Sequence, residues 1–242
     1  MAGERPEDNV GLAAGLAIGA QVAGYRVERQ IGAGGMAVVY LARDERLGRP
    51  VALKVMAPAM AADETFRLRF IRESRAAAAV DDPHIIPVYD AGDADGFLFI
   101  AIRFVSGGDV KSLLLREGPL PAARVAPIVS AVASALAAAH AAGLVHRDVK
   151  PANMLLDSRA GRPDHVYLSD FGLSKDMRSS QLTSPGNFMG TPSYTAPEQV
   201  SGDRVDGRAD QYALACAAFE MLSGDVPFAG PHGWATVWAH LH

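Results

Sequence analysis

The first hundred residues alternate between short apolar runs and turns, a pattern typical of β-strands. Two apolar stretches flank a glycine run at 31–37, and a third follows a turn near residue 50. Residues 25–58 are therefore predicted to form strands joined by tight turns. Residues 85–105 return to strand, with a nearly continuous apolar run from 97 to 105 that suits a strand covered on both faces.

One helix is predicted within this strand-rich part. Residues 63–80 contain many good helix formers. Phe66, Phe70, Glu73 and Ala77 recur at spacings that place them on one helix face. A carboxylate on an apolar face needs a partner, so Glu73 is expected to meet a basic group.

Helical spacing dominates after residue 122. A helix is predicted from about 122 to 143, with Pro127 causing a kink or a late start. Short strands around polar loops are expected over 144–170, and a mobile loop over 174–190, which is rich in Ser, Gly and Met. Residues 207–223 predict a strongly apolar, buried helix.

This order of elements predicts an α+β chain with two lobes. Residues 1–20 are expected to be a flexible leader. Residues 21–105 would form a small sheet lobe with one helix, and residues 106–242 a larger, mainly helical lobe. The hinge between the lobes is expected near 103–108.

Composition narrows the class of protein. The chain has 242 residues, 49% of them hydrophobic and 21% charged, with a net charge of −4. These values fit a globular protein and give no support for a nucleic-acid-binding surface. The chain has a single cysteine, Cys216, so an internal disulfide is excluded. The lack of a disulfide favours a cytoplasmic location. The apolar residues around Cys216 indicate a buried small side chain rather than a reactive thiol. No membrane-spanning segment is expected, because the best candidate, residues 10–24, is too short and rich in glycine.

Four stretches that carry glycines or charged residues follow one another along the chain. They are the glycines at 32–35, "VALK" at 51–54, "HRDVKPAN" at 146–153 and "DFG" at 170–172. Together they resemble the eukaryotic-like (Hanks-type) serine/threonine protein kinases of bacteria, in the actinobacterial style. The resemblance runs from about Tyr25 to the last residue. It implies a protein-kinase-like fold, with an antiparallel N-terminal β-lobe and one key helix, and ATP with Mg²⁺ or Mn²⁺ as cofactors.

The physics of phosphoryl transfer fits several of these residues. Gly32 and Gly34 let backbone N–H groups approach phosphates, although Ala37 stands where the family has a third glycine. Strand alternation places Ala52 and Lys54 on one face, so that a flat base has room beside Ala52. Lys54 can then reach the phosphates and also pair with Glu73.

The resemblance assigns roles in the catalytic loop. Asp148 would orient the substrate hydroxyl, and Lys150 would stabilise the transferring phosphoryl group. Asn153 and Asp170 would bind the metal, since hard oxygen ligands suit Mg²⁺ or Mn²⁺. His146 is expected to pack structurally rather than to act as a base.

The nucleotide site is implied in the same way. Ile102 would line the back of the pocket, and the backbone of Arg103 and Val105 would meet the adenine edge. Arg103 replaces an acidic residue common in the family, a departure expected to matter little. Asp109 would bind the ribose, with turn capping as a nearly equal alternative. The expected nucleotide contacts are Ile31, Gly32, Ala33, Gly34, Gly35, Val39, Ala52, Lys54, Ile102, Arg103, Val105, Asp109 and Leu155.

Substrate choice and regulation are implied by the segment around the activation loop. Lys150 fits the Ser/Thr pattern, Thr191 would shape the substrate pocket, and Asp210 would hold the backbone of the catalytic loop. A phosphate on the loop could order it through Arg147. The candidate phosphorylation sites are Thr183, Ser184, Ser179 and Ser180. Protein substrates with Ser or Thr are expected, together with self-association for autophosphorylation.

The helical lobe is expected to lack its last helices, including the arginine that pairs in the family with the counterpart of Glu198. An alternative function is therefore a nucleotide-binding regulatory module without phosphoryl transfer. The presence of all the expected catalytic residues argues against it. A dinucleotide-binding fold is also disfavoured, because its glycine run should open a helix. A longer parent protein could carry a membrane anchor.

Overall fold

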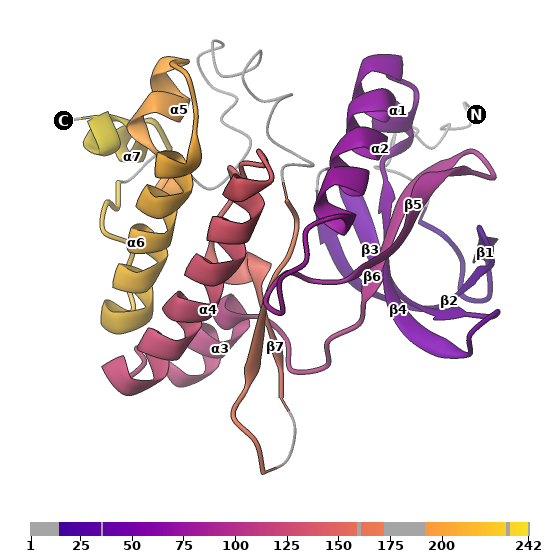
Figure 1. Ribbon diagram of the computed structural model, residues 1–242, viewed down its shortest axis with the longest axis horizontal. Coiled ribbons are helices and arrows are strands. Elements are labelled where there is room, and N and C mark those ends of the chain that lie inside the picture. The colour runs from indigo at the N-terminus through magenta and orange to yellow at the C-terminus, as the bar shows by residue number, and fades with distance from the viewer. Residues whose placement is uncertain (1–14, 35, 159–160, 172–191, 231–232, 242) are drawn as a thin grey trace, which may run out of the picture.

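A computed structural model describes residues 15–34, 36–158, 161–171, 192–230 and 233–241. Figure 1 shows a sheet-based N-lobe beside a helical C-lobe. The two are joined where the last strand of the N-lobe leads into the first helix of the C-lobe. The predicted α+β organisation with two lobes is confirmed.

The N-lobe is built on a six-stranded antiparallel sheet in the order β1-β2-β3-β4-β6-β5. The predicted strands at 25–58 are confirmed, and the region 85–105 is a hairpin of two strands. Its turn uses Asp95 and Gly96, whose φ angles of 56° and 79° suit a tight two-residue connection. The strands are β1 (Gln21–Val22), β2 (Tyr25–Gly34), β3 (Ala37–Asp44), β4 (Arg49–Met56), β5 (Val88–Ala94) and β6 (Phe97–Arg103).

Helices α1 (Pro58–Ala61) and α2 (Glu64–Ala78) follow β4. The carboxylate of Asp63 accepts a hydrogen bond from the Phe66 backbone N–H and so caps α2. The buried residues of α2 are Phe66, Phe70, Ser74 and Ala77. The predicted face is therefore correct for its apolar members, but Ser74 is the buried polar residue, and Glu73 is half-buried beside it.

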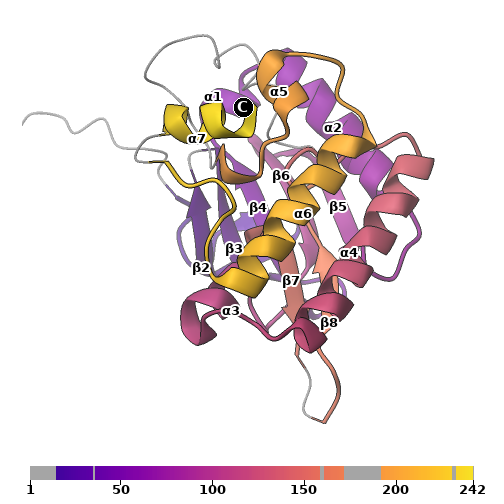
Figure 2. The ribbon, with the colours of Figure 1, turned by 90° about the vertical axis from the view of Figure 1, so that its left-hand side faces the viewer.

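Helices α4 (Ala122–Ala141) and α6 (Gly207–Ser223) form the centre of the C-lobe and run side by side in Figure 2. The small hairpin of β7 (Met154–Asp157) and β8 (His165–Leu168) packs beside them. The remaining elements are α3 (Val110–Glu117), η1 (Pro151–Asn153), η2 (Pro192–Tyr194), α5 (Pro197–Ser201) and α7 (Gly233–Leu241).

Helix α4 has the predicted start. It begins at Ala122 and includes Pro127, so the late start is wrong. Pro127 lies on the exposed side of the helix. It has no N–H to donate to the carbonyl four residues earlier, and on this side that carbonyl can accept a hydrogen bond from water instead. Within the described residues, α4 is the one helix long and apolar enough to cross a membrane, yet 39% of its most apolar window is buried inside the C-lobe.

Helix α6 has the predicted bounds. Asp206 caps its first turn through the Arg208 N–H, and Gly224 ends it in the left-handed region at φ 87°. Ala213, Ala217 and Met221 are buried, but Phe219 and Leu222 are each 49% exposed. The predicted burial of this helix therefore holds for one of its sides and not for the other.

Part of the predicted leader contacts the N-lobe. The Leu16 N–H donates to the Tyr40 hydroxyl at 2.8 Å. The Gly19 N–H donates to the Val27 carbonyl at 2.8 Å. Residues 15–20 therefore lie against the sheet, which corrects the predicted boundary at residue 20. The predicted loop at 174–190 lies outside the described residues.

Candidate active site

The glycine-rich turn lies between β2 and β3. Gly32 is opposite Val39 and Gly34 is opposite Ala37 in the strand register. A Cβ atom built on Gly32 would come no nearer than 3.8 Å to another group, and one on Gly34 no nearer than 4.0 Å. The packing of the hairpin therefore does not require glycine at these two positions. The open space around them is consistent with a ligand approaching the backbone there.

Lys54 and Ala52 point to the same side of β4, as predicted. Ala52 is buried, and the side chain of Lys54 is 16% exposed. The Lys54 ammonium donates to Asp170 Oδ1 at 2.8 Å. This ion pair joins the N-lobe sheet to the segment that follows β8, so the "VALK" and "DFG" motifs, the second and fourth in the sequence, meet here.

The position of Glu73 agrees with a site role. It is half-buried on α2, the helix that also carries the buried Phe66 and Phe70. The ion pair found for Lys54 is with Asp170. The Lys54–Glu73 pair stays a prediction.

Asp148, Lys150 and Asn153 come together in the loop between α4 and β7. The Lys150 ammonium donates to Asp148 Oδ2 at 2.7 Å. The Asn153 amide nitrogen donates to the Asp148 carbonyl at 2.7 Å and to its Oδ2 at 3.2 Å. The Asp148 side chain is 12% exposed. A carboxylate held in this way is fixed in position and still open to a substrate hydroxyl.

His146 is a structural residue, as expected. It is fully buried, donates from Nε2 to the Ser169 carbonyl at 2.8 Å, and accepts the Asp148 N–H at Nδ1. Its ring centroid lies 4.6 Å from that of Phe171. Burial lowers the pKa of His146, against the attraction of Asp210, so the neutral ring is favoured.

Asp210 holds the start of the catalytic loop from the first turn of α6. Its carboxylate accepts the backbone N–H of His146 at 2.8 Å and of Arg147 at 2.7 Å. The predicted role of Asp210 is confirmed by these contacts. His140, at the end of α4, adds a third contact from Nε2 at 2.7 Å.

Sequence reasoning missed His140, because a single histidine near a helix end carries no pattern. The structure shows why it matters: Asp210 is 1% exposed, and a buried carboxylate is destabilising unless donors surround it. His140 also packs over Gly207, where a Cβ atom would lie 2.6 Å from its Nδ1.

Two site residues have left-handed backbone conformations. Arg147 has φ 64° and Asp170 has φ 63°. Non-glycine residues adopt this region at a cost, and they do so mainly where surrounding contacts hold them. At Arg147 the contact is with Asp210, and at Asp170 it is with Lys54.

The predicted adenine pocket is an apolar surface between the lobes. Ile102 and Ala52 are buried and are paired across β4 and β6. They belong to a cluster that continues into the C-lobe through Tyr167. The partly buried members predicted to contact the nucleotide are Val39, Val105 and Leu155. Ile31 and Ala33 are exposed on the glycine-rich hairpin.

Asp109 caps α3. Its carboxylate accepts the Ser112 N–H at 2.8 Å and the Ser112 hydroxyl at 2.9 Å. The capping alternative is therefore confirmed, and contact with ribose stays a prediction. Helix α3 itself was not predicted.

The donor set fits a divalent cation shared with phosphate. Asp170 offers a carboxylate, and because the Asn153 amide nitrogen faces Asp148, the amide oxygen is the atom that a metal would contact. The described residues contain no group of three or more His, Cys, Asp or Glu side chains suited to a metal. Magnesium typically uses few protein ligands together with substrate phosphates and water.

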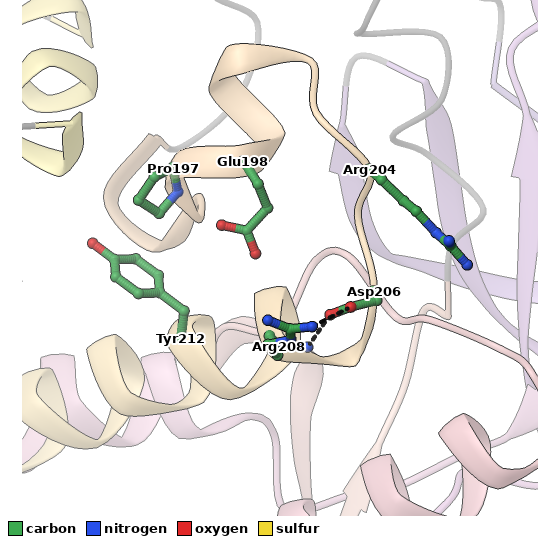
Figure 3. Close-up of a pocket in the computed structure, with 6 residues that line it drawn as sticks. All are labelled: Pro197, Glu198, Arg204, Asp206, Arg208 and Tyr212. Atoms are coloured by element: carbon green, nitrogen blue, oxygen red, sulfur yellow. Dashed lines mark hydrogen bonds and ion pairs between the residues drawn. The ribbon is translucent and has the colours of Figure 1, made fainter.

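Glu198 lies beside a pocket between α5 and α6. The pocket has a volume of about 720 Å³ and is lined by Pro197, Glu198, Arg204, Asp206, Arg208 and Tyr212. Figure 3 shows the Glu198 carboxylate pointing into this space, and Arg208 paired with Asp206 on the other side.

A second buried acid supports the segment after the activation loop. Glu220 is 2% exposed on α6. It accepts hydrogen bonds from the Lys111 ammonium of α3 at 2.6 Å and from the Tyr194 hydroxyl. Burial and this carboxylate together raise the pKa of Tyr194. Three segments distant in the sequence are thereby fixed to one another.

Six predicted site residues lie outside the described residues. They are Gly35, Thr191, Thr183, Ser184, Ser179 and Ser180.

Comparisons with known proteins agree with this geometry. A family model of the protein kinase domain matches residues 25–242. The chain is 46% identical over 229 residues to the serine/threonine-protein kinase PknJ of Mycobacterium tuberculosis, covering 94% of this chain and 39% of PknJ. It is also 46% identical to PknF of the same organism, covering 93% of this chain and 48% of PknF.

The fold has solved counterparts. The kinase domain of M. tuberculosis PknI superposes with a TM-score of 0.74 at 43% identity, covering 90% of this chain and 80% of that one. The chain spans less than half the length of PknJ and PknF. The chain belongs to the protein kinase domain family, and its relatives include bacterial serine/threonine kinases of the Hanks type.

Proposed function

We propose that this domain transfers the γ-phosphoryl group of ATP to serine or threonine hydroxyls of proteins. The observation that carries the proposal is the ion pair between Lys54 Nζ and Asp170 Oδ1, 2.8 Å apart. It lies next to the group formed by Asp148, Lys150 and Asn153. Family membership and the names of the relatives support the same reaction. The choice of Mg²⁺ as metal, protein substrates and a cytoplasmic location are parts of the proposal.

The residues of the chain have distinct roles in this reaction. Asp148 orients the attacking hydroxyl and accepts its proton. The hydroxyl oxygen forms a bond to the γ-phosphorus while the bond to the bridging oxygen of ADP breaks. Lys150 and Lys54 offset negative charge on the transferring and remaining phosphates. A bound divalent cation supplies further charge neutralisation and would be held by Asp170 and Asn153.

Lys54 changes partner in this account. In the structure, the Lys54 ammonium is paired with the Asp170 carboxylate. A bound phosphate would offer the Lys54 ammonium a partner of opposite charge, and Asp170 would hold the divalent cation, so that neither charge would be left buried alone.

Autophosphorylation of the activation loop is a further part of the proposal, with Thr183 as the first candidate. Arg147 directly precedes Asp148, so its guanidinium is at a suitable point of the chain to meet a loop phosphate. Phosphosite mapping after incubation with ATP and Mg²⁺ tests this. Full activity with no phosphate on the loop would contradict it.

The central experiment is transfer of radiolabel from [γ-³²P]ATP to a generic basic protein. Wild type is expected to label the acceptor, and Asp148→Asn is expected to lose at least 100-fold in rate, on the order of the loss when general-base catalysis is removed. Equal signals from both proteins would defeat the proposal, as would absence of labelling by a wild-type protein that is soluble and folded. The second outcome would favour the nucleotide-binding module without transfer.

A further inference from the structure

Arg103 is the last residue of β6 and stands at the junction of the lobes. Its backbone belongs to the N-lobe, since its N–H donates to the Pro87 carbonyl at 3.0 Å and the residue pairs with Val51 of β4. Its side chain reaches the other lobe. Nη2 lies 3.4 Å from Asp157 Oδ2, at the end of β7.

The same guanidinium also lies over the neighbouring strand. Its central carbon is 5.4 Å from the centre of the Tyr167 ring on β8, within the range of a cation–π contact. Tyr167 is 8% exposed and shares a hydrophobic cluster with Ile102. One N-lobe side chain thus contacts both strands of the C-lobe hairpin.

The far end of the connecting segment rests on β7 as well. The Leu156 N–H donates to the Gly108 carbonyl at 2.9 Å. Asp109 forms an isolated bridge with Leu155. Gly107 passes so close that a Cβ atom there would lie 2.2 Å from the Leu156 carbonyl oxygen. Both ends of the connection between the lobes are therefore anchored to one strand.

We propose that Arg103 is a positioning residue that fastens β6 to the β7–β8 hairpin and thereby slows nucleotide release. Rotation of the lobes requires changes in φ and ψ between residues 104 and 106, because the residues on either side are held. Such a change moves Arg103 away from Asp157 and Tyr167, so opening breaks both contacts. The inference rests on the proposed function, since it concerns nucleotide bound between the lobes.

A contact of this kind has a larger effect on motion than on overall stability. The side chains of Arg103 and Asp157 are 32% and 14% exposed, and a partly exposed ion pair contributes little to global folding. Lobe opening, however, breaks it directly. Loss of the ion pair and the cation–π contact is expected to raise the nucleotide dissociation rate about three- to tenfold.

The test measures dissociation of the fluorescent nucleotide mant-ADP, with Mg²⁺ present, by stopped-flow mixing. Arg103→Met and Asp157→Asn are each expected to raise the dissociation rate. The double variant is expected to fall well short of the product of the two effects, because both changes remove the same contact. Arg103→Lys should recover part of the slow release.

The chain offers a matched control in Arg49. Its Nε lies 3.4 Å from Asp44 Oδ2 and its guanidinium lies 3.5 Å from the Tyr89 ring centre, but all three residues belong to the N-lobe sheet or its turns. Arg49→Met is expected to lower the melting temperature without changing the dissociation rate.

The outcomes separate this inference from the proposed function. A wild-type protein that binds mant-ADP, with an Arg103→Met variant that releases it at the wild-type rate, would overturn the role of Arg103 alone. Independent, multiplicative effects of Arg103→Met and Asp157→Asn would also overturn it. Failure of the folded wild type to bind the nucleotide would reject the proposed function, and this inference with it.

Discussion

Gly32 and Gly107 are glycines for different physical reasons. Gly32 has open space around it, with its nearest neighbour for a Cβ atom 3.8 Å away. Gly107 is pressed against β7, where a Cβ atom would lie 2.2 Å from the Leu156 carbonyl oxygen and 2.7 Å from the Ser158 hydroxyl. The first glycine provides access for a ligand, and the second permits backbone packing.

Alanine at these two positions should separate function from stability. Gly107→Ala is expected to lower the free energy of unfolding by about 1–3 kcal/mol, because the backbone must move to relieve the overlap. Gly32→Ala is expected to keep wild-type stability and to raise the KM for ATP. Urea unfolding and steady-state kinetics check the pair. A Gly107→Ala protein as stable as wild type would contradict the close packing of the connecting segment.

His140 is expected to act on the reaction through Asp210. His140→Ala leaves the buried carboxylate with one donor fewer, which should lower the unfolding free energy by about 1–3 kcal/mol. Because Asp210 fixes the backbone just before Asp148, kcat should fall more than the KM for ATP changes. His140→Asn, which retains a donor, should recover part of kcat. A loss of stability with unchanged kcat would show that His140 is structural only.

At the scale of elements, α6 organises the C-lobe through two buried acids. Asp210 in its first turn holds the catalytic loop, and Glu220 near its end holds Tyr194 and Lys111. The two acids lie ten positions apart, so they serve different parts of the site from one rigid helix. The apolar face of α6 packs on α4 and makes this support firm.

The Glu220 contacts can be tested by removing its cation. Lys111→Met leaves Glu220 buried without its basic partner and is expected to lower the unfolding free energy by about 1–3 kcal/mol, a value reduced by the 44% exposure of the Lys111 side chain. The double variant Lys111→Met/Glu220→Gln should recover much of this loss, since no unpaired charge remains. Thermal unfolding checks both proteins. A double variant less stable than the single would contradict the account.

Elements were predictable where local signals were strong. The bounds of α6 were predicted from its apolar run, and α2 was predicted from its many helix formers. Helix α3 was missed because its eight residues lie directly after a hinge and follow an aspartate, Asp109, that could equally serve a ligand. The start of α4 was predicted correctly, but the late-start alternative failed because Pro127 is tolerated on the exposed side of the helix, which the sequence does not reveal.

For the whole molecule, buried histidines predict how stability depends on pH. Burial lowers the pKa of both His146 and His240. The unfolded chain therefore binds protons near the ordinary histidine pKa of about 6.5 while the native protein does not. Stability from these groups is complete above this pH and is lost as the pH falls below it.

The expected slope can be measured by urea unfolding between pH 5 and pH 8. Each excluded proton contributes up to about 1.4 kcal/mol per pH unit below pH 6.5. The acid Asp44 titrates lower: burial opposes its ionisation, but hydrogen bonds from the Leu47 and Arg46 backbone hold its pKa below the ordinary value of 3.8. A variant lacking one of the two histidines, His240→Asn, should show a shallower slope. A stability that stays flat down to pH 5 would contradict neutral burial.

The sequence alone determined the family, the order of the motifs and most of the elements. Spacing within a motif is local, so "HRDVKPAN" identifies Asp148, Lys150 and Asn153 wherever the loop lies in space. Strand alternation likewise places Ala52 beside Lys54, because side chains on a strand alternate regardless of the rest of the fold.

Only the tertiary structure decided which distant residues meet. Lys54 and Asp170 are 116 positions apart, and His140 and Asp210 are 70 apart. The contacts of the Arg103 side chain with Asp157 and Tyr167 likewise depend on how the β7–β8 hairpin packs against the N-lobe. Charges at such separations are brought together by burial of the apolar surfaces around them, and that packing depends on the whole chain rather than on any segment of it.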